Sequence, residues 1–415
     1  MIAIRVLFTI CAAAAAMPVL GQSLTLEDAV RAGEAQSPRL LAQRHALDAA
    51  TSLLGRAAEL PDPKLRFGIE NLPLTGPGNL RYDSDFMTMR SIGLVQDFPN
   101  GDKRAARGVR SERMRDAEQA LLGAEQAALR RDVALAWFEL HYALRARAIL
   151  GALAEQFDAQ AEAAAAGVAR GTQGTAESFM LRGAAGQARD RETELDRAVE
   201  RARIALAVWL GADAQRPLAA PPDAARPPQP LAALLARLPE HPRLQVVDRR
   251  EQLAHSEAEL ARSTKKSDWS LQIGYAQREP AFSNMLSVMV MMDLPWQAER
   301  RQDKDIAARL AEIHRVRAQR EDVRRLAEGE IRGWYADFEA AARRVERFRD
   351  SLLPLARERI EAALAAYRGG RGELGAVLEA RRSATETELA LNGAEAQRAR
   401  AWASLNFIYR PEASQ

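Results

Sequence analysis

The residues best suited to chemistry are five histidines, and they form no catalytic pattern. They stand at positions 45, 141, 241, 255 and 314, and no two have the i, i+4 spacing with which a helix presents a pair of metal ligands. The sequence also has no Gly-x-Ser-x-Gly elbow, His-Glu-x-x-His motif, P-loop or dinucleotide fingerprint. We therefore predict a chain that is not an enzyme, that holds no cofactor or resident metal, and whose histidines lie on helix surfaces.

Methionines are concentrated in one short stretch. Thioether sulfur is a soft ligand that suits Cu(I) and Ag(I), and methionine is also well suited to filling irregular apolar space. Because the stretch has the periodicity of a strand, we interpret these methionines as apolar filling and predict no metal site there. They are Met285, Met289, Met291 and Met292.

Two glycine-rich turns with flanking arginines are the remaining candidates for function. Each follows a long helical stretch and precedes another, so we expect each to lie at the end of a helical hairpin. Glycine accepts the positive φ angles that reverse a chain, and we expect all five glycines to serve that purpose. The first glycine turn contains Arg170, Gly171 and Gly174; the second contains Arg368, Gly369, Gly370, Arg371 and Gly372.

The composition indicates long solvated helices. Lys and Arg number 59 against 56 Asp and Glu, for a formal charge of +3, and aromatic residues make up only 6%. The basic residues are interleaved with acidic ones, so the charge does not favour nucleic-acid binding. The single cysteine, Cys11, precedes most of the apolar N-terminal segment and is a poor lipoprotein acceptor. Without another cysteine, the mature chain has no disulfide.

The first residues read as a targeting segment. Arg5 precedes an apolar stretch from Val6 to Leu20, and small residues follow, so we predict a signal peptide over 1–21 that is cleaved before Gln22. The alternative is an uncleaved anchor, for which the stretch is short. No later segment offers ~20 uncharged apolar residues. We expect an exported chain that is periplasmic or that crosses the outer membrane as strands.

The chain repeats itself. Ser37-Pro38-Arg39-Leu40 recurs as His241-Pro242-Arg243-Leu244, Ser91 to Pro99 parallels Ser287 to Pro295, and the two glycine turns also match at nearly the same spacing. We predict a first repeat over 22–215, a Pro-rich linker over 216–230, a second repeat over 231–409 and a C-terminal tail over 410–415.

Long helices dominate each half. Apolar residues recur every seven positions between Lys103 and Ala169, and a second a/d seam is expected from Ile331/Trp334 to Leu352/Leu355, with a bend or break at Pro354. A helix of ~67 residues is ~100 Å long. Two shorter helices, Leu24 to Leu60 and Thr175 to Leu210, would together match that length and complete a hairpin.

Alternating strands complete each half. From Lys64 to Glu70, Leu65, Phe67 and Ile69 alternate with polar neighbours, and so do Trp269 to Tyr275. The stretch from Leu286 to Leu294 also alternates, although Met289 and Met291 interrupt its polar face. The same period fits a half-buried soluble strand or an outer-membrane barrel strand. Four strands cannot close a barrel, which needs at least about eight, so a barrel would require several copies of the chain.

Taken in order, these features resemble the TolC-like outer membrane efflux proteins, also called outer membrane factors. The most specific part is Tyr367-Arg368-Gly369-Gly370 leading into Val377-Leu378-Glu379-Ala380, and the likeness extends from about Leu24 to Tyr409. It implies a mainly α fold with two repeats per chain, each with long hairpins and two strands. It also implies a homotrimer with a twelve-stranded outer-membrane barrel on a periplasmic helical tunnel.

The resemblance also implies a function and partners. The chain would be the exit duct of a tripartite efflux system, in contact with outer membrane lipid, a periplasmic adaptor and an inner-membrane RND-type transporter. The glycine turns would form the periplasmic tip. Tyr367 matches the family's tip tyrosine, Glu379 matches one position of its acidic ring, and Glu177 is the corresponding acid of the first repeat, whereas Ala376 replaces another ring carboxylate.

The cargo and two other protein classes stay open at this point. Pro61-Asp62-Pro63 and Gly101-Asp102-Lys103-Arg104 are similar to the heavy-metal resistance branch, which implies divalent cations; the alternative is a multidrug or other small-molecule duct. A periplasmic adaptor would have one hairpin rather than two repeats with strand pairs. A purely structural coiled-coil rod would have no strand pairs.

Overall fold

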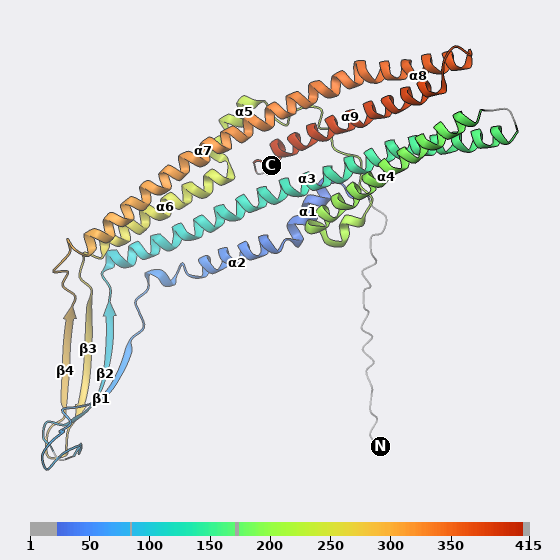
Figure 1. The fold of residues 1–415 in the computed structure, drawn as a ribbon. Helices are drawn as coiled ribbons and strands as arrows, with labels where there is room; N and C mark the ends of the chain where they lie inside the picture. The colour runs from blue at the N-terminus through green and yellow to red at the C-terminus, as the bar shows by residue number, and fades with distance from the viewer. Residues whose placement is uncertain (1–22, 84, 171–173, 410–415) are drawn as a thin grey trace, which may run out of the picture. The chain divides into compact units, whose positions relative to one another are not determined.

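The computed structural model describes residues 23–83, 85–170 and 174–409 (Figure 1). The chain divides into two compact units. The first unit takes its described residues from 1–36, 132–226 and 339–400, and the second from 37–131, 227–338 and 401–415. Both units draw on both halves of the sequence. The predicted signal peptide over 1–21, the tail over 410–415 and Gly171 lie outside the described residues.

The two halves of the chain repeat the same order of elements, as predicted. In each half, helices precede two strands, and long helices follow them. The first half contains α1 (Leu26–Gln36), α2 (Pro38–Ser52), β1 (Lys64–Glu70), β2 (Met89–Phe98), α3 (Gly101–Ala169) and α4 (Thr175–Leu210). The second contains α5 (Leu231–Ala236), α6 (Pro242–Ser263), β3 (Trp269–Gln277), β4 (Met285–Met292), α7 (Gln302–Arg347), α8 (Leu353–Arg368) and α9 (Leu374–Asn406).

The prediction of one helix from Leu24 to Leu60 is wrong, because the chain breaks at Ser37 and Pro38. The Ser37 hydroxyl accepts a hydrogen bond from the backbone N–H of Leu40, and Pro38 occupies the first turn of α2. Serine is a favoured N-cap, and proline is tolerated only where a helix begins. Two helices therefore replace the single one, and α2 ends at Ser52.

The expected break at Pro354 is confirmed, and it changes the helix seam. A π-helical segment, Phe348–Leu352, separates α7 from α8. The proline ring clashes with the carbonyl four residues earlier, which belongs to Asp350 inside that segment. A π turn holds one extra residue and so rotates everything after it. Leu352 and Leu355, predicted for the seam, are exposed, and Leu353 packs beside the buried Val345 instead.

The four strands form one antiparallel sheet in the order β1-β2-β3-β4, within the second unit. Phe67 pairs with Ile92, Ile92 with Tyr275, and Ile273 with Val288. Side chains alternate between the faces of a sheet, so this register gathers the apolar residues on one face. Phe98 and Trp269 stack at its end with their ring centroids 4.2 Å apart. Within the described chain, β1 and β4 are edge strands.

The helices bury small and aliphatic residues inside each unit. In the first unit, Leu150 and Phe157 of α3 pack against Leu181 of α4 and Leu378 of α9. In the second unit, α6 packs its apolar stripe against Ile313 and neighbouring residues of α7. The heptad prediction for α3 is confirmed at Leu122, Leu129, Leu150, Phe157 and Ala164, which are all at most 8% exposed.

Candidate functional site

The second glycine turn, which lies in the first unit, connects α8 to α9. Only one of its glycines has a positive φ. Gly370 has φ +66°, in the left-handed region. Gly369 has φ −81° and caps α8. Gly372 is required for a different reason, because a Cβ there would lie 3.0 Å from Cβ of Ala366. Close packing and one left-handed residue therefore build this turn.

The first glycine turn differs. Gly174 is the N-cap of α4 with φ −76°, and no atom lies within 4 Å of the position its Cβ would take. The expectation that every glycine supplies a positive φ is thus wrong for Gly174, Gly369 and other described members, since an extended or helical backbone accepts any residue. Arg170, Arg368 and Arg371 are exposed at these turns.

Tyr367 and Glu177 meet at the ends of α8 and α4. The Tyr367 hydroxyl donates a hydrogen bond to Oε1 of Glu177 at 3.4 Å, joining residues far apart in sequence. Burial, followed by the negative charge of Glu177, raises the pKa of the Tyr367 hydroxyl. The tyrosine therefore stays protonated and keeps its donor at neutral pH. The structure brings together two of the three predicted gate residues.

Glu379 lies elsewhere on α9, in a salt bridge with Arg382. The nitrogen-to-oxygen distance is 2.6 Å, and half of the Glu379 side chain is exposed. Both residues line a pocket of about 260 Å³ in the first unit, which Leu150 and Phe157 also line. Sequence reasoning missed Arg382, although the i, i+3 spacing of the two charges signals such a pair.

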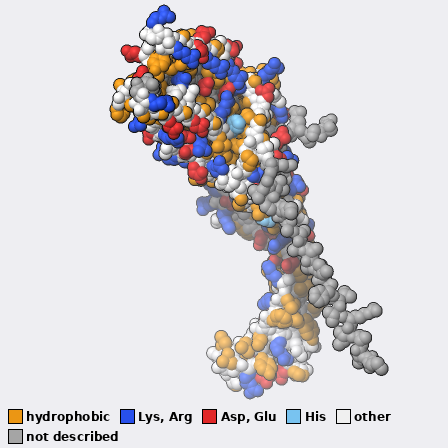
Figure 2. Space-filling model, turned by 90° about the vertical axis from the view of Figure 1, so that its right-hand side faces the viewer, with side chains coloured by type: hydrophobic (Ala, Val, Ile, Leu, Met, Phe, Trp, Pro, Cys, Tyr) orange, Lys and Arg blue, Asp and Glu red, His pale blue; other side chains and the backbone are white. Residues whose placement is uncertain are grey.

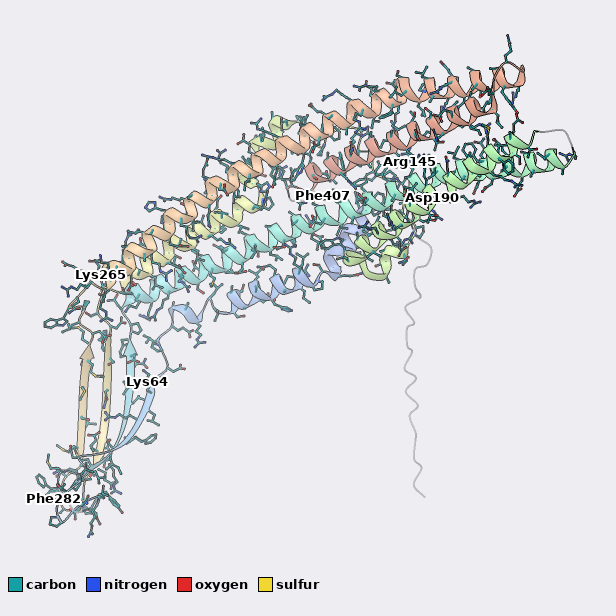
Figure 3. All side chains as sticks on the ribbon, viewed as in Figure 1. Lys64, Arg145, Asp190, Lys265, Phe282 and Phe407 are labelled. Atoms are coloured by element: carbon teal, nitrogen blue, oxygen red, sulfur yellow. The ribbon has the colours of Figure 1, made fainter. Side chains whose placement is uncertain are left out.

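The buried carboxylate of Glu395 on α9 was also not predicted from the sequence. The Glu395 side chain is 3% exposed, and it pairs with Arg145 of α3 and with Arg349 of the π-helical segment. Figure 3 shows Arg145 between α3 and α9. One turn away, Asn392 donates a hydrogen bond to the carbonyl of Tyr142 at 3.0 Å. A buried charge is retained only when it is paired, so the two arginines are what allow Glu395 to lie in this seam. We call Glu395, Arg145 and Arg349 together the Glu395 clamp.

His241 contradicts the prediction that the histidines lie on helix surfaces. It is 6% exposed and caps α6, its Nδ1 accepting a hydrogen bond from the backbone N–H of Arg243 at 3.3 Å. Burial, with the charge of Arg243 as a smaller cause, lowers the pKa of His241 to about 4. His141 is half-buried, stacked on Trp137, and its pKa is also lowered, mainly by burial. Both imidazoles are therefore neutral at pH 7.

The apolar face of the sheet is exposed in the single chain. Hydrophobic side chains gather over the sheet and its loops, at the bottom of Figure 2. On this face, the exposed fraction is 70% for Phe67, 73% for Leu286 and 64% for Val288. Contiguous apolar surface of this kind marks contact with a partner or with a membrane.

Over residues 23–83, 85–170 and 174–409, none of the helices has the length and apolar character required for a membrane span. In the same parts of the chain, no three or more His, Cys, Asp or Glu side chains cluster so as to hold a metal ion.

Known proteins match this chain in structure rather than in sequence. No protein-family model matches it, and no curated protein matches it. The outer membrane protein VceC from Vibrio cholerae has a TM-score of 0.74 at 17% identity, over 92% of this chain and 95% of VceC. The CmeC outer membrane channel of Campylobacter jejuni has a TM-score of 0.77 at 14% identity, over 93% of this chain and 87% of CmeC.

A third match is CusC, whose structures concern folding and transmembrane channel formation. It has a TM-score of 0.76 at 15% identity, over 92% of both chains. At these identities the likeness shows the fold. The protein therefore has the mainly helical fold with a small antiparallel sheet that outer membrane channels share.

Proposed function

We propose that this chain is the exit duct of a tripartite efflux system in the outer membrane of a Gram-negative cell. The observation that carries this proposal is the likeness to outer membrane channels over 92% of the chain or more. The exposed apolar face of the sheet supports it, because lipid is the solvent that such a face requires. The duct is passive: the inner-membrane RND-type transporter supplies energy and direction.

The proposed assembly is a homotrimer. One chain supplies four strands with open edges at β1 and β4, whereas a closed barrel needs at least about eight. Pairing β4 of one copy with β1 of the next removes every edge, and three copies give a twelve-stranded barrel. Residues 1–21 are the proposed cleaved signal peptide, and the two repeats meet at the linker over 216–230.

We place adaptor docking at the two glycine turns and the gate beside them. The hydrogen bond between Tyr367 and Glu177 supports this placement, since it ties two helix ends that would have to separate for the turns to move apart. Three copies of Glu379 would attract cations at the constriction. The proposed cargo is divalent heavy-metal cations.

Fractionation of cells that express the full chain tests the class of protein. We expect the chain in the outer membrane, as a trimer on gels that boiling converts to monomer. A chain found in the periplasm or inner membrane would instead indicate an adaptor. A water-soluble rod without heat-sensitive trimers would contradict a membrane duct.

A deletion strain, with the gene restored on a plasmid, tests the cargo. We expect restorable sensitivity to zinc, cadmium, cobalt and nickel salts. Sensitivity confined to drugs and detergents would overturn the metal assignment and leave the duct in place. In bilayer recordings, Glu379→Gln should reduce cation selectivity, whereas Glu358→Gln, an exposed residue of α8, should leave it unchanged.

A further inference from the structure

The register of β4 separates its methionines between the two faces of the sheet. Met289 pairs with Gln272 and Met291 with Ser270, while Val288 and Val290 pair with Ile273 and Leu271. Because side chains alternate along a strand, Met285, Met289 and Met291 share the polar face. Met292 lies on the apolar face with Leu286. The interpretation of the methionines as apolar filling thus suits the face of Met292, whereas the other three methionines lie on the polar face.

The three methionines of the polar face are accessible. The exposed fractions are 49% for Met285, 50% for Met289 and 46% for Met291. Their cross-strand partners on this face are small or neutral: Ala276, Gln272 and Ser270. Because about half of each side chain is exposed, burial of apolar surface does not by itself account for large side chains at these positions, and the sulfur atoms are the feature to explain.

Spacing allows two of these sulfurs to meet. Residues i and i+2 of a strand are roughly 6.5–7 Å apart along its axis and point the same way. Methionine has three rotatable bonds beyond its Cα, so the thioethers of Met289 and Met291 can close on one ion. Met285 is four residues from Met289, about 13 Å away along the strand, too far to join the same ion.

The chemistry of the face selects the ion. Thioethers are soft ligands that favour Cu(I) and, by the same softness, Ag(I), whereas carboxylates and imidazoles suit harder divalent ions. Across the sheet, the same face carries the Asp97 carboxylate opposite Ser270. That carboxylate is held by Lys64 at 2.7 Å, so the surroundings of the two sulfurs favour a soft monovalent cation over a divalent one.

We propose that Met289 and Met291 form a two-sulfur site for Cu(I) or Ag(I), with Met285 as a separate contact further along the strand. Two neutral thioethers bind weakly, so the ion exchanges rapidly. Its place in transport rests on the proposed function: if the polar face lines the duct, the site holds soft monovalent cations that pass in addition to the proposed divalent cargo. The binding itself does not depend on that function.

Silver titration of the purified full chain in detergent tests the site. Methionine methyl groups are labelled with ¹³C and observed by NMR as silver nitrate is added without chloride. We expect saturable shifts of the Met289 and Met291 methyl signals, assigned with Met289→Leu and Met291→Leu. The double variant should bind silver at least tenfold more weakly. Zinc at the same concentrations should leave these signals in place.

Met292→Leu is the matched control, since it removes a thioether from the apolar face of the same strand. It should retain the silver-induced shifts of Met289 and Met291. Equal shifts of all methionines, or unchanged binding by the double variant, would overturn the site. Leucine replaces methionine with little loss of packing, so each variant should still form the heat-sensitive trimer. Silver binding without trimers would refute the duct alone, and trimers without silver binding would refute the site alone.

Discussion

The helix seams and the sheet of this protein differ in how far their hydrophobic side chains are exposed. In the seams between helices, the chain covers its own hydrophobic residues: Leu150 is 2% exposed and Phe157 is 3% exposed. Along the sheet, Phe67 and Leu286 remain more than two-thirds exposed. The buried helix seams are thus formed within one chain, whereas the apolar face of the sheet stays uncovered in that chain.

Charges follow the same division. On α7, Glu321 accepts hydrogen bonds from Arg324 and Arg325, which lower its pKa to about 2. Such pairs at i, i+3 and i, i+4 suit a helix face in water. The apolar face of β4 carries Leu286, Val288, Val290 and Met292 without an ionisable residue. The paired charges of α7 therefore suit water, whereas this face of β4 offers no charged or polar side chain to water.

The largest expected effect is that of a charge on the apolar face of the sheet. Val288→Arg should abolish the heat-sensitive trimer, because the proposed function puts this face against lipid, where an arginine near the midplane costs about 2–4 kcal/mol. Ser287→Arg, the next residue, points to the polar face and should still assemble. Gel mobility with and without boiling measures both. Equal loss in the two variants would contradict the assignment of the faces.

The Glu395 clamp should dominate the stability of the helical region. Arg145→Ala with Arg349→Ala leaves a buried carboxylate unpaired, and we expect a loss of about 3–5 kcal/mol in unfolding free energy. Adding Glu395→Gln should recover part of that loss, because the buried charge is then absent. Chemical denaturation followed by circular dichroism measures these values.

A suitable control for the clamp is Arg31→Ala, which removes an exposed i, i+3 pair with Asp28 and should change stability by less than about 1 kcal/mol. If the triple variant were no more stable than the double one, the desolvated charge would not be the source of the loss.

His241 should make part of the stability depend on pH. Its pKa is about 4 in the folded protein against an ordinary 6.5, so the unfolded chain binds more protons between these values. This contribution is complete above about pH 6.5, decreases as the pH falls and is lost below about 4, a change of roughly 3 kcal/mol. Denaturation at a series of pH values should show His241→Asn, which keeps a capping acceptor, with a flatter profile than the wild type.

Control measurements use the exposed His45. His45→Asn should change the unfolding free energy little, because its ring lies on the surface of α2. If His241→Asn differed from the wild type by the same amount at every pH, the titration of this histidine would not contribute.

Much of the fold follows from local sequence signals, and the departures have local causes. The strand alternation predicts β1 with its observed ends, and α4 matches its predicted range. The break at Pro38 and the π turn before Pro354 alter helices that the apolar pattern alone describes as continuous, since proline changes backbone geometry without changing hydrophobicity.

The site is harder to predict because it depends on tertiary pairing. Glu395 looks like any helix-surface acid until α3 and the π-helical segment bring two arginines to it. Alternation along the strand already predicts the face on which Met289 lies, but its cross-strand partner Gln272 is known only from the register of the sheet. Tyr367, by contrast, follows from the family resemblance and Glu177 from the matching position of the first repeat, and a hydrogen bond joins the two.

The smallest expected effect distinguishes the two glycine turns. Gly370 has φ +66°, and a side chain in that region costs roughly 1–2 kcal/mol. Gly174 has φ −76° with open space around it, so Gly174→Ala should be neutral. Hydrogen exchange of the backbone amides over 366–376 should be about tenfold faster in Gly370→Ala, because 1.4 kcal/mol of local stability corresponds to that factor. If both variants exchanged like the wild type, the second turn would be adaptable, and its positive φ would not be what holds α8 and α9 together.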